Sequence, residues 1–239
     1  MDALAVALVP AQCARTATDC EHCRMRLRSI CSALDRDELA ELESIAQPVH
    51  FAAKETLFVE GEEAQAAYTL TRGTARLYRV FDDGRRQILG FMLPGDFIGL
   101  DLASHRAFSA DAVDEVSACR FSRTGFAALT ARKPHLLKRL HAATARELNL
   151  AQDQTMALGR RSAQEKLAWF LVHLRQRSAP QSDLVPLAMS RLDIADFLGL
   201  TIETVSRTLT RLARQKIVAL VPEGVRLLDI ARIEALAAT

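Results

Sequence analysis

The amino-acid sequence predicts an α+β protein with an antiparallel β-roll of jelly-roll type, then a long helix, then a winged helix-turn-helix. Short β-type runs broken by glycines occupy residues 49–121, and a heptad-spaced stripe follows Pro134. Two short amphipathic segments flank Gly199 near the C-terminus. The expected divisions are a cysteine-rich segment at 1–31, the β-roll at 32–132, the long helix at 133–159 and the winged helix-turn-helix at 160–239.

The composition is that of a globular protein with enough apolar material for real cores. Of the 239 residues, 49% are hydrophobic and 25% are charged. No apolar run reaches the roughly 18 residues that a membrane-spanning helix needs. From these features we expect a cytoplasmic protein with no membrane partner.

Three cysteines near the N-terminus, Cys20, Cys23 and Cys31, form a C-x2-C-x7-C pattern, and a helical stretch at 32–45 follows. In a protein expected in the cytosol, such a group indicates metal or redox chemistry rather than structural disulfides. Soft thiolates favour zinc, copper(I) or an iron–sulfur cluster. With Cys119 as a remote fourth ligand, the set fits a cubane cluster held between an N-terminal loop and a folded domain. Zinc binding and a thiol switch remain alternatives.

The surroundings of these cysteines carry further expectations. Three basic residues are expected to lower the pKa of the neighbouring thiols: Arg24, Arg26 and Arg28. Cys119 is a candidate ligand only because the N-terminal cysteines need a fourth thiolate, since a lone cysteine on a strand is more often a small core residue. The first 19 residues carry little pattern and are expected to be mobile, and the sequence assigns no role to Cys13 among them.

Between Val49 and Phe121 the chain has the sequence pattern of a β-sandwich. Glycines recur about every eleven or twelve residues, at Gly61, Gly73, Gly84 and Gly95. Turn signals at this spacing are typical of an antiparallel sandwich or jelly roll. A late strand is expected at residues 111–121 and contains Cys119.

A long helix is predicted from Pro134 to Gly159, since proline suits the first turn of a helix. Side chains spaced alternately four and three residues apart form a stripe along it: Leu137, His141, Thr144, Leu148, Ala151, Thr155 and Leu158. Such a heptad stripe is suited to pairing with the same stripe of a second copy. The alternative is that the stripe packs on its own domain.

The first helix of the predicted helix-turn-helix begins after Ser190, a good N-cap with Asp193 three residues on in a capping-box-like spacing. Its expected buried face consists of Leu192, Ala195 and Leu198. Gly199 ends this helix, because glycine accepts a left-handed conformation without a side-chain penalty.

Thr201 is expected to cap the second helix, whose apolar face consists of Ile202, Val205, Leu209 and Leu212. The opposite face then presents Glu203, Ser206, Arg207, Thr210 and Arg214. A helix with an apolar back and such a polar front, following a glycine turn, suits the major groove of DNA. The alternative is an ordinary amphipathic helix pair with a solvated face.

The flanks favour DNA binding. A helix is predicted at 160–177, a loop at 178–183, two short strands around the turn at Pro222, and a last helix from about Ile230. Residues 160–239 carry 12 basic and 8 acidic side chains, whereas the remainder has a net charge of −2. This is the sign expected of a phosphate-binding module. Two such heads about one DNA turn apart require two-fold symmetry, which favours a homodimer.

In their order, these segments resemble the Crp/Fnr superfamily of bacterial transcription regulators over nearly the full length. The narrower resemblance is to the Fnr/FixK-like, oxygen-responsive iron–sulfur branch. It is carried by the C-x2-C-x7-C run with the remote Cys119, and by E-x-x-S-R at Glu203, Ser206 and Arg207. The resemblance implies that the roll is of the cyclic-nucleotide-binding type.

The resemblance also implies a cofactor, a [4Fe-4S] cluster bound through Cys20, Cys23, Cys31 and Cys119. Relatives of this branch hold the cluster when oxygen is absent, dimerise, and bind palindromic double-stranded DNA with TTGAT-type half-sites. Oxygen destroys the cluster, and DNA binding is lost. Such regulators control anaerobic or microaerobic genes, and activation works through RNA polymerase.

The chemistry of the second helix agrees with such half-sites. Arg207 can fork onto guanine O6 and N7, and Glu203 can accept a hydrogen bond from cytosine N4. Ser206 can approach a thymine or a phosphate. The remaining residues of the expected DNA-facing set are Thr201, Thr210 and Arg214.

Two features depart from the superfamily pattern. Residues 95–110 lack the glutamate and the Arg-Ser pair that hold a cyclic nucleotide in other members, so no cyclic nucleotide is expected. Some Fnr-type relatives have an acidic residue in the dimer seam where this chain has Ala151, so the dimer is expected to persist without the cluster. The alternative input is thiol redox, structural zinc or a small ligand on the same fold. No enzyme is expected, because no catalytic motif stands out.

Overall fold

The computed structural model describes residues 20–99, 104–178 and 180–238. The expectations for residues 1–19, including Cys13, lie outside the described residues. The chain divides into two compact units, of which the first comprises Met1–Leu77 and Phe91–Ala145. The second comprises Tyr78–Gly90 and Arg146–Thr239. A hairpin from the middle of the chain therefore belongs to the same unit as the C-terminal elements.

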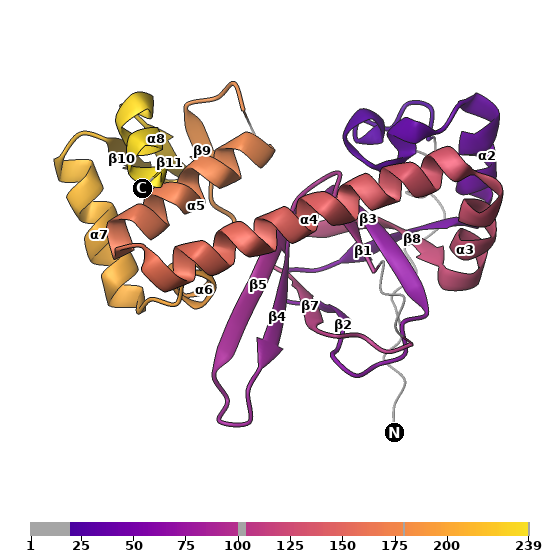
Figure 1. The fold of residues 1–239 in the computed structure, drawn as a ribbon, viewed down its shortest axis with the longest axis horizontal. Coiled ribbons are helices and arrows are strands. Elements are labelled where there is room, and N and C mark those ends of the chain that lie inside the picture. Colours follow the sequence, from indigo (N-terminus) through magenta and orange to yellow (C-terminus); the bar gives the residue numbers. More distant parts are fainter. Residues whose placement is uncertain (1–19, 100–103, 179, 239) are drawn as a thin grey trace. The chain divides into compact units, whose positions relative to one another are not determined.

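Two four-stranded sheets form the roll, with strand orders β1-β8-β3-β6 and β2-β7-β4-β5 (Figure 1). Their strands are β1 Ala46–Phe51, β2 Thr56–Phe58, β3 Ala66–Arg72, β4 Ala75–Val80, β5 Arg86–Met92, β6 Phe97–Ile98, β7 Ser109–Ala112 and β8 Val116–Ser122. The pairings β1–β8, β3–β8, β3–β6 and β2–β7 are antiparallel. The predicted antiparallel roll is confirmed.

The single late strand predicted at 111–121 is wrong, because the chain changes sheets within it. β7 ends at Ala112 in one sheet and β8 begins at Val116 in the other. Asp114 in the connection accepts a hydrogen bond from the backbone N–H of Thr74 at 2.6 Å. This connection packs closely against the turn between β3 and β4, because a Cβ on Gly73 in that turn would collide with the carbonyl oxygen of Glu115. The alternation of Ala110 and Ala112 resumes in phase at Val116 and Ala118, so the polar pair Asp114-Glu115 is a weak sign of the connection in the sequence.

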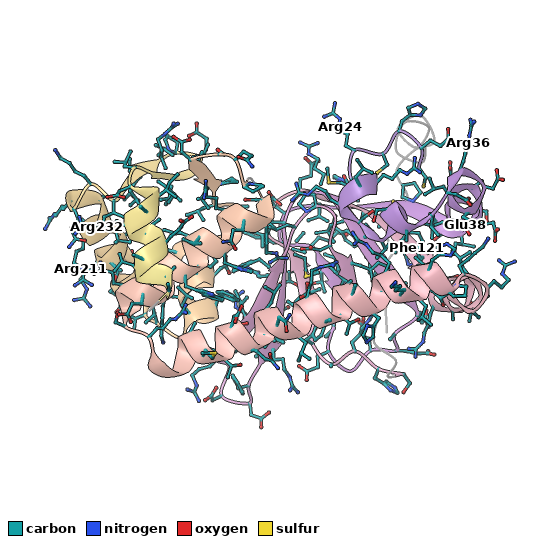
Figure 2. All side chains as sticks on the ribbon, turned by 45° about the horizontal axis from the view of Figure 1, so that its top comes forward. Arg24, Arg36, Glu38, Phe121, Arg211 and Arg232 are labelled. Carbon is teal, nitrogen blue, oxygen red and sulfur yellow. The ribbon has the colours of Figure 1, made fainter. Side chains whose placement is uncertain are left out.

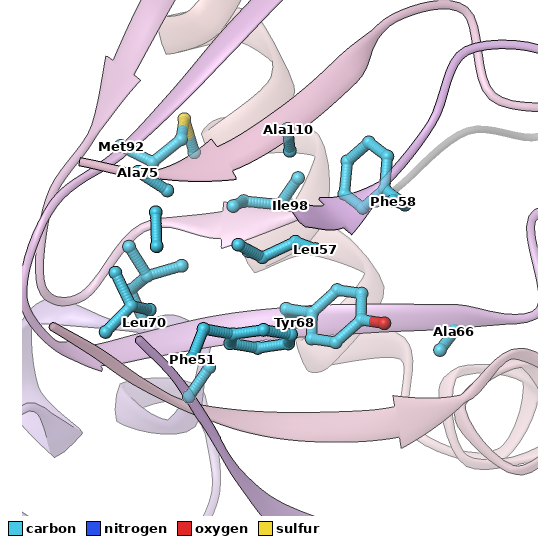
Figure 3. Close-up of a cluster of buried hydrophobic side chains, with 13 residues drawn as sticks. Phe51, Leu57, Phe58, Ala66, Tyr68, Leu70, Ala75, Met92, Ile98 and Ala110 are labelled. Atoms are coloured by element: carbon cyan, nitrogen blue, oxygen red, sulfur yellow. The ribbon is translucent and has the colours of Figure 1, made fainter. Parts of the chain in front are cut away.

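Buried side chains from both sheets form one core (Figure 3). Tyr68 on β3 contacts Phe51 and Phe58, with ring centroids 6.2 Å apart in each pair. Burial of a large apolar side chain stabilises a fold by about 1.5–3 kcal/mol. This core holds the two sheets face to face.

A second core in the same unit joins short N-terminal helices to β8. The helices are η1 Arg26–Arg28, η2 Ile30–Ala33, α2 Arg36–Ile45, α3 Arg123–Arg132 and α4 Pro134–Arg160. The core consists of Ile30, Leu34, Leu39, Leu42, Phe121, Phe126, Leu129, Leu136 and Leu140. The helix predicted from residue 32 begins only at Arg36, because Asp35 caps it and accepts the N–H of Glu38 at 2.9 Å.

The predicted long helix is confirmed as α4, although its apolar stripe is not the face it buries. Leu136, Leu140 and Ala157 are buried, whereas Leu137 and Leu148 are 57% and 59% exposed. The other stripe residues are exposed or half-buried. Within one copy of the chain, the stripe is thus largely uncovered. In the described part of the chain, no helix is long and apolar enough to cross a membrane.

The second unit contains the elements predicted for a winged helix-turn-helix. They are α5 Ala163–Ser178, β9 Leu184–Pro186, α6 Arg191–Leu198, α7 Ile202–Arg214, β10 Val218–Val221, β11 Gly224–Leu227 and α8 Ile230–Ala238. The two strands predicted around Pro222 are β10 and β11. A third strand, β9, pairs with β11 and was not predicted, because a three-residue segment ending in proline carries no strand pattern of its own.

Candidate DNA-binding head and cysteine corner

The DNA-binding head is residues 190–216, which contain α6, the turn and α7. Ser190 caps α6 as predicted: its hydroxyl accepts the N–H of Asp193 at 3.1 Å, and the Asp193 carboxylate accepts the N–H of Ser190 at 3.0 Å. Gly199 has φ +60°, the predicted left-handed stop. A Cβ at this position would lie 3.2 Å from Cδ2 of Leu158. The turn between the helices therefore requires glycine for its conformation and has little room for a side chain.

In α6 and in α7, one residue that was predicted to be buried is exposed. Leu192 is 50% exposed and Ile202 is 40% exposed. Both residues lie in the first turn of their helices. Their spacing matches the apolar face of each helix, but no neighbouring element covers that face in the first turn. The residues that α6 does bury are Asp193, Ile194, Ala195, Phe197 and Leu198.

The polar front of α7 lies as predicted. Thr201 caps the helix by accepting the N–H of Thr204 at 3.2 Å. Val205, Thr208, Leu209 and Leu212 are buried, and the opposite face consists of the exposed Glu203, Arg207, Thr210 and Arg214 with the half-buried Ser206. The Thr210 hydroxyl donates to the carbonyl of Ser206 at 2.9 Å, so it has an intrahelical partner.

Glu203 is held in its charged form. Its own backbone N–H, the Thr201 hydroxyl and the charge of Arg207 lower the pKa of the Glu203 carboxyl, against a smaller opposing effect of burial. An ionised carboxylate only accepts hydrogen bonds, which is what an amino group on a base edge requires.

The sequence did not predict the ion pairs that join Arg86 to α6 of the DNA-binding head. Arg86 on β5 donates to Asp193 at 2.8 Å and to Asp196 at 2.7 Å, and Gln87 donates to the carbonyl of Asp196 at 2.7 Å. Burial opposes the positive charge, but the two carboxylates outweigh it and raise the pKa of Arg86. The partners are more than 100 residues apart in the chain, so no local pattern could have shown them.

The cysteine corner is the set Cys20, Cys23, Cys31 and Cys119, which are all half-buried and form no disulfide. Cys31 lies on η2, and Cys119 lies on β8 opposite Pro48 and Thr69. Cys20, Cys31 and Cys119 pack against the same core, the one that contains Phe121. Folding thus brings the remote cysteine to the side of the roll where the N-terminal cysteines lie.

Burial governs the protonation of Cys119 and Cys31. Burial, together with the charges that Cys20, Cys31 and Cys23 carry as thiolates, raises the pKa of Cys119 to about 12. Burial also raises the pKa of Cys31, and Arg26 has only the smallest of the opposing effects. Arg26 thus lowers the pKa of Cys31 as expected, but burial outweighs this effect and the pKa is raised overall.

A [4Fe-4S] cluster fits the corner by donor chemistry. Within the described residues, no three histidine, cysteine, aspartate or glutamate side chains are arranged to hold a metal ion. However, Cys119 interacts electrostatically with the other three thiols, and Cys20, Cys31 and Cys119 pack on one core. A cubane takes one thiolate on each of its irons rather than four on one ion. Bound iron would also stabilise the thiolates that burial disfavours.

Arg106 is a buried cation inside the roll that no sequence pattern had singled out. It is only 4% exposed, its guanidinium carbon lies 4.3 Å from the Phe58 ring centroid, and it donates to the carbonyl of Ala66. A ring face and a hydrogen bond make such burial tolerable. Arg106 lies in the segment 95–110, where the sequence lacks an Arg-Ser pair.

A β-roll joined to a winged helix-turn-helix with a polar reading face defines a DNA-binding transcription regulator. The sequence profile of the "Cyclic nucleotide-binding domain" matches residues 48–133, and that of the "Crp-like helix-turn-helix domain" matches residues 165–236. The chain belongs to the Crp/Fnr family of transcription regulators. Regulators of this family bind DNA, typically as dimers.

Similar proteins and structures come from several bacteria. The chain is 50% identical to the transcriptional activatory protein AadR of Rhodopseudomonas palustris, over 92% of this chain and 93% of that protein. It is 48% identical to the nitrogen fixation regulation protein FixK of Bradyrhizobium diazoefficiens, over 92% and 94%. The structure of FixK2 from Bradyrhizobium japonicum superposes with a TM-score of 0.78 at 35% identity, covering 82% of this chain and 98% of that one.

Proposed function

We propose that this regulator responds to oxygen through a [4Fe-4S] cluster on Cys20, Cys23, Cys31 and Cys119, and controls anaerobic or microaerobic genes. The observation that carries the proposal is the position of Cys119. A strand residue almost 90 positions beyond Cys31 packs on the same core as Cys20 and Cys31. When bound, the cluster supplies a centre that reacts with oxygen.

The names of similar proteins support the same proposal. One relative, 31% identical over 85% of this chain, is the fumarate and nitrate reduction regulatory protein of Salmonella typhi. Others are named for nitrogen fixation regulation or as transcriptional activators. We therefore infer an activator that works with RNA polymerase.

The reading face supports binding to palindromic DNA with TTGAT-type half-sites. Arg207 would fork onto guanine and Glu203 would accept from cytosine, since the former is exposed and the latter is ionised. Ser206 would lie at a thymine or phosphate. Residues Thr201, Thr210 and Arg214 would contact the DNA around them.

A homodimer would form along α4. The stripe of Leu137, His141, Thr144, Leu148, Ala151, Thr155 and Leu158 is mostly uncovered in one copy, and apolar heptad positions are stable when a second helix covers them. Because Ala151 places no charge in this seam, we expect the air-exposed protein to remain dimeric in gel filtration. A clean monomer would contradict this expectation.

The experiment compares wild type with Cys119→Ser and Cys13→Ser, all purified without oxygen. We expect wild type and Cys13→Ser to be brown, to contain iron and sulfide, and to bind a TTGAT palindrome until air bleaches them. Cys119→Ser should lack the colour and bind DNA weakly. Circular dichroism checks that this variant folds. Colourless wild-type protein with stoichiometric zinc would overturn the cluster and favour the same DNA-binding fold with a zinc input.

A further inference from the structure

A pocket of about 280 Å³ lies on the flank of α7, lined by Ala163, Thr204, Arg207, Thr208 and Arg211. All five residues belong to the second unit. We propose that this pocket holds one phosphate of the DNA backbone and that Arg211 is its main ligand. The inference rests on the proposed DNA binding and assigns a contact that the base-reading residues do not provide.

The pocket faces a different direction from the base-reading front of α7. Thr204, Thr208 and Arg211 lie at positions i, i+4 and i+7 and so form one stripe along the helix. At 3.6 residues per turn, this stripe is roughly a quarter turn away from Glu203 and Arg214. A helix that points its front at base edges in the major groove turns its flank toward the phosphates of the groove wall.

The lining has the chemistry of an anion site. It contains two guanidinium groups and two hydroxyl-bearing side chains, and no carboxylate. Thr208 is buried, while the Thr204 hydroxyl lies 3.0 Å from that of Thr201. Ala163 begins α5, so the partial positive charge of this helix end adds to the field in the pocket.

The two arginines are in different electrostatic situations. Arg207 follows Glu203 by one helical turn on the reading front. The pKa of Glu203 is lowered by its own backbone N–H, by the Thr201 hydroxyl and, to a smaller extent, by the charge of Arg207. In the part of the chain that the structure describes, no ion pair engages the exposed side chain of Arg211. Figure 2 shows this side chain at the edge of the unit.

These differences assign separate tasks along one helix. Arg207 borders both the reading front and the pocket and contributes to sequence preference. Arg211 borders only the pocket, where it would meet a group that every DNA sequence presents. A planar guanidinium can bind a phosphate through two parallel hydrogen bonds, which a lysine cannot reproduce.

The test measures DNA affinity of the full-length protein, purified without oxygen, over a series of salt concentrations. Each protein is titrated with a TTGAT palindrome and with a scrambled duplex of equal length. The variants are Arg211→Ala, Arg211→Lys and Arg207→Ala. The matched control is Arg232→Ala, which removes another exposed charge from α8 in the same unit.

We expect Arg211→Ala to bind both duplexes roughly tenfold more weakly, with an unchanged ratio between them. The slope of log affinity against log salt should become shallower by about 0.9 for each phosphate that the variant no longer neutralises. Arg211→Lys should recover most of the slope but only part of the affinity. Arg232→Ala should leave both quantities near wild type, and all variants should keep the wild-type melting temperature.

Two results overturn the phosphate site. One is an Arg211→Ala slope equal to that of Arg232→Ala, and the other is a changed ratio between the two duplexes in Arg211→Ala. Failure of the proposed base reading is a separate outcome, because wild type itself would then bind both duplexes equally. In that case the difference in slope between wild type and Arg211→Ala still decides the phosphate site.

Discussion

The DNA-binding head and the cysteine corner differ in how completely the folded chain prepares them. The head is built from regular helices with side-chain caps, a glycine turn and buried apolar faces. The corner joins the irregular segment of Cys20 and Cys23 to η2 and β8, and three of its four cysteines pack against a core. In the head, the lowered pKa of Glu203 keeps its carboxylate charged. In the corner, burial keeps Cys31 and Cys119 protonated.

This difference indicates that the DNA-binding head is preformed, whereas the cysteine corner would need a ligand to reach its working state. A preformed reading face loses little entropy when it meets DNA. Thiols with raised pKa values become thiolates more readily when a cation binds them, so the proposed cluster would convert the corner to its working state. The proposed oxygen response therefore depends on the cysteine corner, whereas the fold alone sets the geometry of the DNA-binding head.

The largest effect on the prepared head should come from its core. Leu198→Ala on α6 removes a fully buried side chain and should lower the free energy of unfolding by about 2–5 kcal/mol. Leu192→Ala on the same helix is the matched control, and because Leu192 is half exposed we expect a change below about 1 kcal/mol. Chemical denaturation measures both. Equal losses would show that the faces of α6 are assigned wrongly.

The next effect concerns the reading face. Arg207→Ala should cost roughly 1–3 kcal/mol in binding to a TTGAT palindrome and relax the preference at the guanine. Gel shifts against half-sites with each base at that position measure the preference. Unchanged preference in the variant would show that Arg207 does not read the base.

A smaller effect comes from a histidine in the second unit. Burial, with a smaller contribution from the charge of Arg177 and against the charge of Asp153, lowers the pKa of His173 to about 4. The ring stacks on Trp169 with centroids 5.5 Å apart. The unfolded chain takes up this proton near pH 6.5 and the folded chain only near pH 4. The free energy of unfolding should therefore decrease as the pH is lowered from 6.5 to about 4.

A shift of this size corresponds to at most about 3.4 kcal/mol. Because the His173 ring is only half-buried and solvent screens it, we expect a loss on the order of 2 kcal/mol, with no further contribution from His173 below pH 4. Thermal unfolding at a series of pH values measures it. The control His173→Gln should lose the acid-dependent step. A variant that keeps the full pH dependence would assign the step to other groups.

The smallest effect concerns the helix caps that prepare the head. Ser190→Ala removes the hydroxyl that accepts the N–H of Asp193 and should lower stability by about 1 kcal/mol. Ser44→Ala on the exposed side of α2 is a suitable control, since its hydroxyl bonds only a carbonyl in its own helix. Equal changes in the free energy of unfolding of the two variants would mean that the Ser190 cap does not stabilise the DNA-binding head.

Features of this protein that depend on neighbours in the chain could be predicted from the sequence alone. The cap at Ser190, the left-handed turn at Gly199, the wing strands around Pro222 and the length of α4 all follow from local hydrogen bonding, allowed backbone angles and short periodicities. The polar front of α7 follows from the same periodicity, because an amphipathic helix fixes its outer face once its inner face is apolar.

Features that join distant segments became visible only in the folded chain. Folding placed Cys119 on the core of the N-terminal cysteines, split the late strand between two sheets, and paired Arg86 with Asp193 and Asp196. It also left Leu192 and Ile202 exposed, although their spacing matches a buried face. Which side of a helix or strand is covered depends on the element that packs there, and local spacing contains no information about that element.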